Sequence, residues 1–144
     1  MRGMHRLLVD TNVLLDGVVA SRPQHNEARG LMSAARASGY ELWVLASSLK
    51  DAYYLLCRHY RDETSARAVI SAIRGGTCLA PLTADVVDDA LSSDEPDFED
   101  GLVRAAAESL GCVAIVSRDS AAFTRSSSLR VDSAGALDLM ARGL

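Results

Sequence analysis

The sequence has no apolar stretch of the roughly 20 residues that a membrane-spanning helix requires. It also lacks a continuous hydrophobic segment before a small-residue cleavage site near its start. We therefore expect a soluble, cytoplasmic protein with no membrane partner. Only three cysteines occur, and the irregular spacing of Cys57, Cys78 and Cys112 argues against a disulfide framework or a cysteine-based metal site. Buried, reduced thiols are the expected state.

Other absences exclude several function classes. Neither a glycine-rich phosphate loop nor a Rossmann glycine fingerprint occurs, so no nucleotide cofactor is expected. His5, His25 and His59 do not fall at the ends of expected strands, which argues against histidine-based ribonuclease chemistry. Lys50 is the only lysine, whereas a phosphoacceptor signalling domain would need one near its last strand. A dehalogenase-type phosphatase would need Asp where Asn12 stands.

What the chain does contain fits an ordinary globular protein. Its 144 residues, 49% hydrophobic and 24% charged, are enough for one domain with a sizeable core. The net charge of −4 argues mildly against nucleic-acid binding by bulk electrostatics, because phosphate binders are usually basic. If some of the 19 acidic residues hold metal ions, however, their local charge is neutralised or reversed. The local arrangement of the acids therefore matters more than the total.

Short apolar runs alternate with helical patterns along the chain. Runs typical of strands occur at residues 7–9, 42–45, 78–79, 113–116 and 129–131, the last as an edge strand. Apolar residues at helical spacing occur at 28–35, 49–56, 66–73, 86–91, 103–110 and 134–142. A parallel neighbour strand needs a crossover, and a helix is the common one. The sequence thus predicts α/β architecture, a single three-layer α/β/α domain over residues 1–144 with a central parallel sheet of four to five strands.

Polar residues before several of these helices indicate where they begin. Thr83 is expected to cap the helix that follows it. Ser48 with Asp51 three residues later has the spacing of a capping box, which alone would explain Asp51. Asp97 and Asp100 repeat that spacing at a later helix. We expect Asp97 to cap this helix while Asp100 turns its carboxylate into a cleft.

Two carboxylates lie at the carboxyl ends of apolar strands. Asp10 ends the first strand, with Thr11 and Asn12 available to hydrogen-bond it or a ligand, and these three residues suit a turn. Asp119 follows the most apolar strand, and Ser117 offers a hydroxyl on the same side of the extended chain. Because the carboxyl ends of parallel strands open onto one edge of the sheet, these side chains should meet there.

Crowded carboxylates repel, and a divalent cation is the usual remedy. Each acidic position also has a structural explanation, as a turn residue or a helix cap, but their convergence on one edge favours metal binding. The predicted metal ligands are Asp10, Asp51, Asp97, Asp100 and Asp119.

The charged neighbours of these acids have weaker assignments. Asp16 is expected either to support the site or to face solvent, and Glu99 to be solvated. Arg104, one turn after Asp100, has the spacing of an ion pair. The best candidates for contacts with an RNA backbone are Lys50, Arg58, His59, Arg61, Arg104, Arg118 and Arg125.

Four segments in this order, residues 7–16, 47–54, 97–100 and 115–123, together resemble the PIN-domain family. Single-domain PIN proteins of this size resemble the toxins of VapBC-type toxin–antitoxin pairs. The resemblance implies Mg²⁺ or Mn²⁺ held by Asp10, Asp51, Asp100 and Asp119, with Asp97 as an auxiliary. It implies an endoribonuclease that cuts single-stranded or structured RNA with metal-activated water. The second acid is most often Glu in this family, so the shorter Asp51 would reach the metal through water.

The resemblance also implies partners: an RNA substrate, a cognate antitoxin protein and a second copy of the chain in a homodimer. Apolar residues around more than one face of segment 53–56 are consistent with an interface. Ser117 or Thr11 would position water or phosphate. The alternative is a catalytically silent PIN-like binding or scaffold module, against which the retained acids argue.

Overall fold

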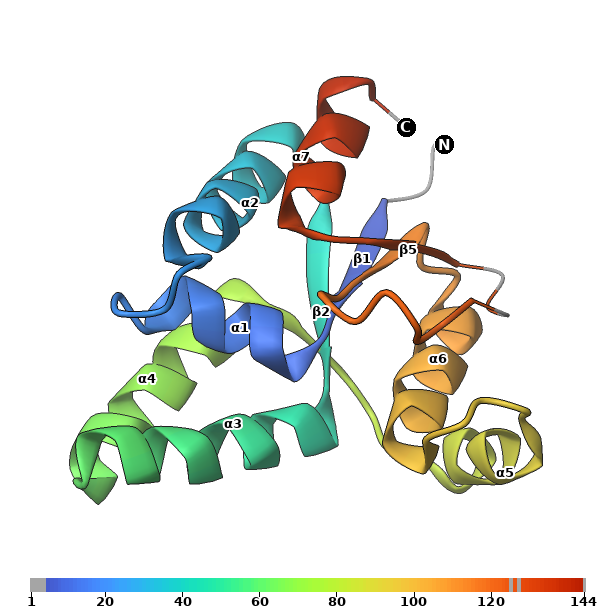
Figure 1. Cartoon of the computed structure of the whole chain (residues 1–144), viewed down its shortest axis with the longest axis horizontal. Coiled ribbons are helices and arrows are strands. Elements are labelled where there is room, and N and C mark those ends of the chain that lie inside the picture. The colour runs from blue at the N-terminus through green and yellow to red at the C-terminus, as the bar shows by residue number, and fades with distance from the viewer. Residues whose placement is uncertain (1–4, 125, 127, 144) are drawn as a thin grey trace.

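The computed structural model describes residues 5–124, 126 and 128–143. Its strands form one sheet of five, all pairs parallel, in the order β3-β2-β1-β4-β5 (Figure 1). Their bounds are β1 Arg6–Val9, β2 Glu41–Leu45, β3 Cys78–Ala80, β4 Ala114–Val116 and β5 Leu129–Val131. The predicted α/β fold with a parallel sheet of four to five strands is confirmed, and β5 lies at an edge as expected.

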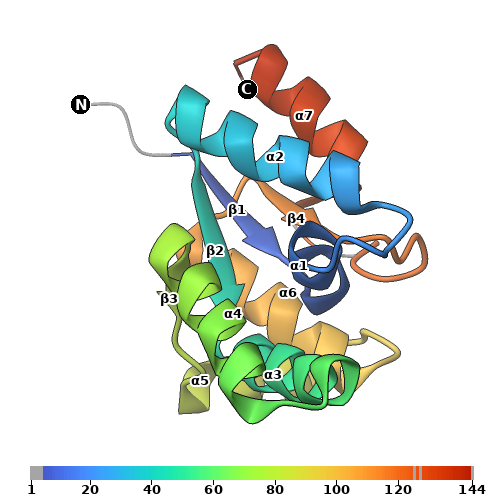
Figure 2. The ribbon, with the colours of Figure 1, turned by 90° about the vertical axis from the view of Figure 1, so that its left-hand side faces the viewer.

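Helices cover both faces of the sheet. Their bounds are α1 Thr11–Val18, α2 His25–Ser38, α3 Ala46–Tyr60, α4 Glu63–Gly76, α5 Ala84–Ser92, α6 Phe98–Leu110 and α7 Ser133–Ala141. Buried residues of α1, α2, α4 and α7 share one core cluster with the strands, and those of α5 and α6 share another. Figure 2 shows the strands between α2 and α7 on one side and α5 and α6 on the other. In the described part of the chain, no helix is long and apolar enough to cross a membrane.

The central strand β1 is buried on both sides, as a parallel strand between two helix layers must be. Leu7 and Val9 face the core cluster beside α2, whereas Leu8 faces the cluster beside α6, following the two-residue repeat of a strand. On the neighbouring strand β4, Ile115 is paired with Leu8 and is equally buried. This packing fixes the direction in which β1 and β4 end.

Two helices begin at the N-cap residues that the sequence predicted. The Thr83 hydroxyl accepts a hydrogen bond from the Val86 N–H and caps α5. Asp97 caps α6, accepting from the N–H groups of Glu99 and Asp100 at 2.7 and 3.2 Å. The start of α6 is thereby fixed, and with it the position of the acids in its first turn.

The predicted capping box of Ser48 and Asp51 is wrong. Helix α3 begins at Ala46, and Leu45 at its N-cap makes no side-chain capping hydrogen bond. The chain passes from β2 straight into α3 because Leu45 is buried at the end of the strand, so packing rather than a cap sets the helix start. Ser48 is buried inside the helix. The carboxylate of Asp51 is therefore not used by a cap.

Candidate active site

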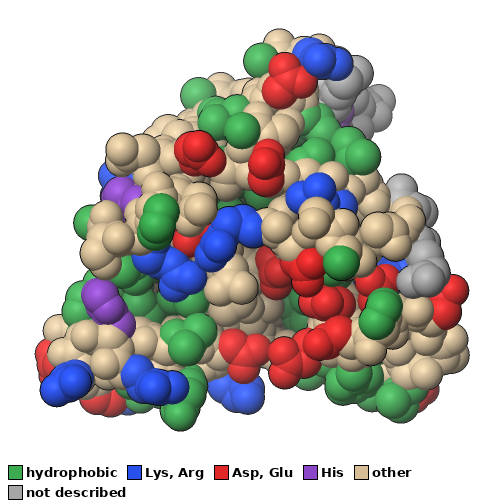
Figure 3. All heavy atoms as spheres, viewed as in Figure 1, with side chains coloured by type: hydrophobic (Ala, Val, Ile, Leu, Met, Phe, Trp, Pro, Cys, Tyr) green, Lys and Arg blue, Asp and Glu red, His purple; other side chains and the backbone are tan. Residues whose placement is uncertain are grey.

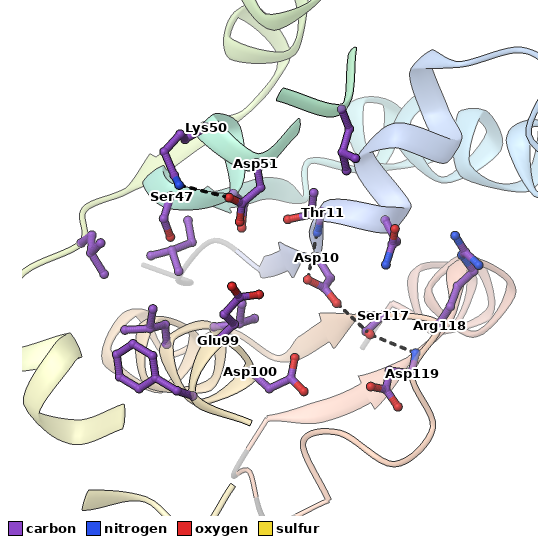
Figure 4. Close-up of a pocket in the computed structure, with 18 residues that line it drawn as sticks. Asp10, Thr11, Ser47, Lys50, Asp51, Glu99, Asp100, Ser117, Arg118 and Asp119 are labelled. Carbon is purple, nitrogen blue, oxygen red and sulfur yellow. Dashed lines mark hydrogen bonds and ion pairs between the residues drawn. The ribbon is translucent and has the colours of Figure 1, made fainter. Parts of the chain in front are cut away.

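A cleft of about 580 Å³ opens at the carboxyl ends of β1, β2 and β4 (Figure 4). Side chains from separate parts of the chain line it, as the topology predicted. The acidic residues among them are Asp10, Asp51, Glu99, Asp100 and Asp119. The expected neighbours Thr11, Asn12 and Ser117 line it too. Asp97, by contrast, does not line the cleft and has its carboxylate engaged in capping α6.

Asp10 lies at the end of the central strand. The structure corrects the expected turn after it, because α1 begins at Thr11 and Asp10 is its N-cap. The Asp10 carboxylate accepts hydrogen bonds from the Thr11 N–H at 2.9 Å and the Ser117 hydroxyl at 3.1 Å. Burial raises the pKa of Asp10, and those two hydrogen bonds oppose the rise. The carboxylate is thus held in one orientation at the floor of the cleft.

Ser117 connects the ends of the two central strands. Its buried hydroxyl donates to Asp10 and accepts a hydrogen bond from the Asp119 N–H at 3.1 Å (Figure 4). The Asp119 carboxylate in turn accepts from the Ala121 N–H at 3.0 Å. Ser117 therefore lies beside Asp119 as expected. Its hydroxyl links the carboxylate of Asp10 to the backbone of Asp119.

Asp100 is the acid most affected by its neighbours. Its pKa rises from 3.8 to about 6, first because of burial and then because of the negative charges of Asp97, Asp10 and Asp119. Glu95 adds a smaller effect of the same sign. Carboxylates from three separate segments therefore act on one another across the cleft.

Asp51 and Glu99 lie on facing walls of the cleft (Figure 4). Asp51 is half-exposed and forms an ion pair with Lys50 at 3.5 Å. Glu99 is exposed to solvent as expected. It nevertheless lines the cleft, so the expectation that it points elsewhere on its helix is wrong. The sequence pattern of α6 shows which residues share a face, but not which face the end of β2 meets.

Glu95 joins the loop before α6 to the loop after β4. One of its carboxylate oxygens accepts a hydrogen bond from the Phe123 N–H at 2.7 Å. Phe123 has a φ of 62° and a side chain that is almost completely buried. This residue is held in an unfavourable backbone region by packing and by Glu95, so the loop after β4 has a defined path.

The acids offer oxygen ligands only, which suits a hard divalent cation such as Mg²⁺ or Mn²⁺. The mutual effect of Asp10, Asp100 and Asp119 on pKa shows negative charge that a cation would compensate. Within residues 5–124, 126 and 128–143, however, no group of three or more His, Cys, Asp or Glu side chains is arranged to hold a metal ion. The donor chemistry fits, while the ligand set stays a prediction.

Asp16 was expected either to support the site or to face solvent, and the sequence did not decide between the two. It is completely buried, which excludes solvent exposure, one of the two alternatives that the sequence left open. Its two carboxylate oxygens accept from Arg22 Nε and Arg118 Nε, each at 2.9 Å. A buried carboxylate requires such partners, but nothing in the local sequence indicates that Arg118, distant along the chain, supplies one.

Only some of the basic residues predicted to contact an RNA backbone lie at the cleft. Lys50 and Arg118 line the cleft. Arg104 does not pair with Asp100, because its guanidinium lies 3.8 Å from Asp94 and 3.5 Å from Glu108. The group at residues 58–61 lies at the carboxyl end of α3, where positive charge complements the helix dipole. Arg125 lies outside the described residues.

Comparison with known proteins shows similarity over most of the chain. Residues 6–121 match a family model described as PIN domain. The structure resembles that of VapC20 from Mycobacterium tuberculosis, a sarcin-ricin loop cleaving toxin, with a TM-score of 0.63 and 23% identity over 79% of this chain and 90% of that one. No curated protein matches the sequence.

Two further solved structures are similar. A toxin–antitoxin complex from Klebsiella pneumoniae has a TM-score of 0.63 and 16% identity over 88% of this chain and 97% of that one. VapBC2 from Rickettsia felis, bound to a DNA fragment from its promoter, has a TM-score of 0.65 and 9% identity over 88% and 98%. At these identities the likeness establishes the fold.

Proposed function

Because the chain belongs to the PIN-domain family, we propose that it is a metal-dependent endoribonuclease and the toxin of a toxin–antitoxin pair. The observation that carries the proposal is the acid-lined cleft at the carboxyl ends of the strands. Its carboxylates come from β1, α3, α6 and the loop after β4, so only the complete fold assembles them. A similar structure is that of a sarcin-ricin loop cleaving toxin.

We assign metal binding to Asp10, Asp51, Asp100 and Asp119, with Asp97 acting as an auxiliary through its cap on α6. When bound, Mg²⁺ or Mn²⁺ supplies Lewis-acid chemistry, which acidifies water and stabilises charge on a phosphodiester. Ser117 keeps the Asp10 carboxylate in place through its hydroxyl.

The walls of the cleft suit unpaired RNA. Leu55, Leu82 and Phe98 line it and remain 40%, 42% and 47% exposed. Exposed apolar and aromatic surfaces beside a phosphate-binding site are typical of proteins that bind single strands, because bases stack on them. The proposed substrate is therefore RNA with unpaired nucleotides at the cut, in a single strand or in the loop of a folded RNA.

Partners follow from the same comparison. Two of the similar structures contain a toxin with its antitoxin, which supports a cognate antitoxin for this chain. A homodimer is also proposed, because Tyr54 and Leu55 on α3 are 61% and 40% exposed. Size-exclusion chromatography with light scattering tests the dimer, and a monomer at all concentrations would contradict it.

Cleavage of fluorescently labelled single-stranded RNA tests the nuclease. Purified protein is incubated with Mn²⁺, Mg²⁺ or EDTA, beside an Asp10→Asn/Asp100→Asn double variant. The matched control replaces two exposed acids of α5, Asp88→Asn/Asp89→Asn, and is expected to cut like the wild type. Metal-dependent cutting that only the cleft variant loses supports the proposal. No cutting, together with no calorimetric Mn²⁺ binding, would instead favour a silent binding module.

A further inference from the structure

Asp16 is a buried carboxylate that the acid-lined cleft does not use. It lies in α1 and is completely shielded from solvent. One oxygen accepts from Arg22 Nε at 2.9 Å and from Arg118 Nη2 at 3.3 Å, and the other accepts from Arg118 Nε at 2.9 Å. Arg22 belongs to the segment between α1 and α2, whereas Arg118 follows β4. Two distant segments therefore converge on one acid, and we call these three residues the Asp16 cluster.

The Asp16 cluster has more positive than negative charge. Two guanidinium groups share a single carboxylate, so the cluster carries one net positive charge. The arginine side chains are still 29% and 37% exposed, and Arg118 lines the cleft. In the described part of the chain, the Nη1 group of each arginine has no hydrogen-bond partner. Figure 3 shows Lys and Arg side chains directly beside Asp and Glu side chains in the hollow of this face.

The surroundings hold the two guanidinium groups in place. Arg22 Nη2 donates to the Asn12 side-chain oxygen at 3.4 Å. His25 Nδ1 lies 2.8 Å from the backbone oxygen of Asp16 and fixes the end of α1. A buried carboxylate is costly unless its partners stay bound, and the two-nitrogen contact with Arg118 fixes the plane of that guanidinium. The cluster is thus preorganised before any ligand arrives.

We propose that Arg22 and Arg118, held by Asp16, bind a phosphate group of the RNA backbone beside the acid-lined cleft. This inference rests on the proposed function and names the residues that bind its substrate. RNA phosphates are repelled by the acids of the cleft, and its other cation, Lys50, is already paired with Asp51. Planar guanidinium groups with open donors match phosphate oxygens. Asp16 is a positioning residue in this arrangement.

Binding of a short fluorescein-labelled oligouridylate, measured by fluorescence anisotropy in EDTA, tests the role of the arginines without cleavage. Arg22→Gln and Arg118→Gln each remove one positive charge while keeping a hydrogen-bond donor toward Asp16. Between about 50 and 200 mM KCl, each is expected to weaken binding several-fold and to lower the slope of log K against log salt by about 0.7. The matched control is Arg67→Gln on α4, an exposed arginine outside the cleft that pairs with Glu63. Its affinity and slope should equal those of the wild type.

Thermal melts of each variant show whether it folds. If a Gln variant does not, Arg118→Lys replaces it, because lysine keeps the charge but cannot make the two-nitrogen contact. That variant is expected to keep the salt slope and bind several-fold more weakly, and unchanged affinity would overturn the proposal. Asp16→Asn then separates positioning from charge. It removes one negative charge, which offsets the effect of the lost orientation on affinity, so binding should not weaken. Cleavage should fall on the order of ten-fold, because the arginines no longer hold the phosphate in one position.

Different results would contradict the nuclease proposal and the phosphate-binding proposal. If the wild type cuts RNA but both Gln variants keep its affinity and salt slope, the arginines only hold the loops together and the inference is overturned. If the wild type cuts no RNA but the Gln variants lose affinity and slope, the phosphate site stands and the nuclease does not. An Asp16→Asn variant that cuts at the wild-type rate would remove the positioning role of Asp16.

Discussion

Replacing Asp100 with Asn should stabilise the metal-free protein at neutral pH, although it removes a proposed metal ligand. In the folded state, partial burial and the negative charges of four other carboxylates raise the pKa of Asp100 to about 6. At pH 7 the wild type must therefore keep a charge in a place that disfavours it. An asparagine of nearly the same shape removes that repulsion.

The magnitude follows from the pKa. A rise from 3.8 to about 6 corresponds to an upper limit of about 3 kcal/mol at pH 7. Because Asp100 is only partly buried, solvent screening reduces this to about 1 to 1.5 kcal/mol. Loss of a negative charge in the first turn of α6 costs about 0.5 kcal/mol. A net gain of about 0.5 to 1 kcal/mol, or about 2 to 3 °C in Tm for a chain of this size, is expected.

The stability difference between the variant and the wild type should depend on pH, and its sign follows from the pKa of Asp100. Since the pKa of Asp100 is higher in the folded state, its contribution to stability is fully present below the unfolded value of 3.8 and is lost as the pH rises through about 6. Urea denaturation in EDTA, at pH values between about 4 and 7, should show the variant's advantage growing with pH. Mn²⁺ should reverse the order, because only the wild type keeps the full set of carboxylates.

An exposed acid on α5 provides the control, since Asp88→Asn should change stability little at any pH. The reasoning is refuted if the Asp100→Asn variant is no more stable than the wild type at pH 7. It is refuted equally if the difference between the two proteins is the same at pH 4 and at pH 7.

Three further predictions concern hydrogen bonds and ion pairs. Ser117→Ala removes the donor to Asp10 and should lower the free energy of unfolding by about 1 to 2 kcal/mol in urea titrations. Glu95→Ala leaves the Phe123 N–H unpaired and should cost about 2 kcal/mol, whereas Glu95→Gln, which keeps an acceptor, should cost less in the same titration. Lys50→Ala breaks only an exposed ion pair, so a loss above about 0.5 kcal/mol would contradict its assignment.

The pattern of apolar residues was sufficient to predict the sheet and the positions at which its central strands end. Apolar runs of three or four residues located β1 and β4, and the acids close to their carboxyl ends, Asp10 and Asp119, reach the cleft as predicted. The reason is that a short buried strand has few alternatives, and the carboxyl ends of parallel strands must meet. Thr83 and Asp97 were also predictable, because an N-cap depends on residues close in sequence.

Features that depend on how helices meet were not predictable. Ser48 and Asp51 have the spacing of a capping box, but burial of the end of β2 starts α3 before them. Glu99 reaches the cleft because of the direction in which α6 packs, which its own sequence does not encode. Asp16 is paired with an arginine 102 residues away, so only the folded chain reveals why it is buried.

The sheet order has a consequence for protein synthesis. Strand β1 leaves the ribosome first, yet one of its two neighbours, β4, begins only at residue 114. Until then Asp10 has neither the Ser117 hydroxyl nor Asp119 beside it, and the nascent chain lacks the part of the cleft that Ser117, Arg118 and Asp119 form. If the chain is a toxin, a translating ribosome is exposed to no active nuclease before the fourth strand has been made and docked.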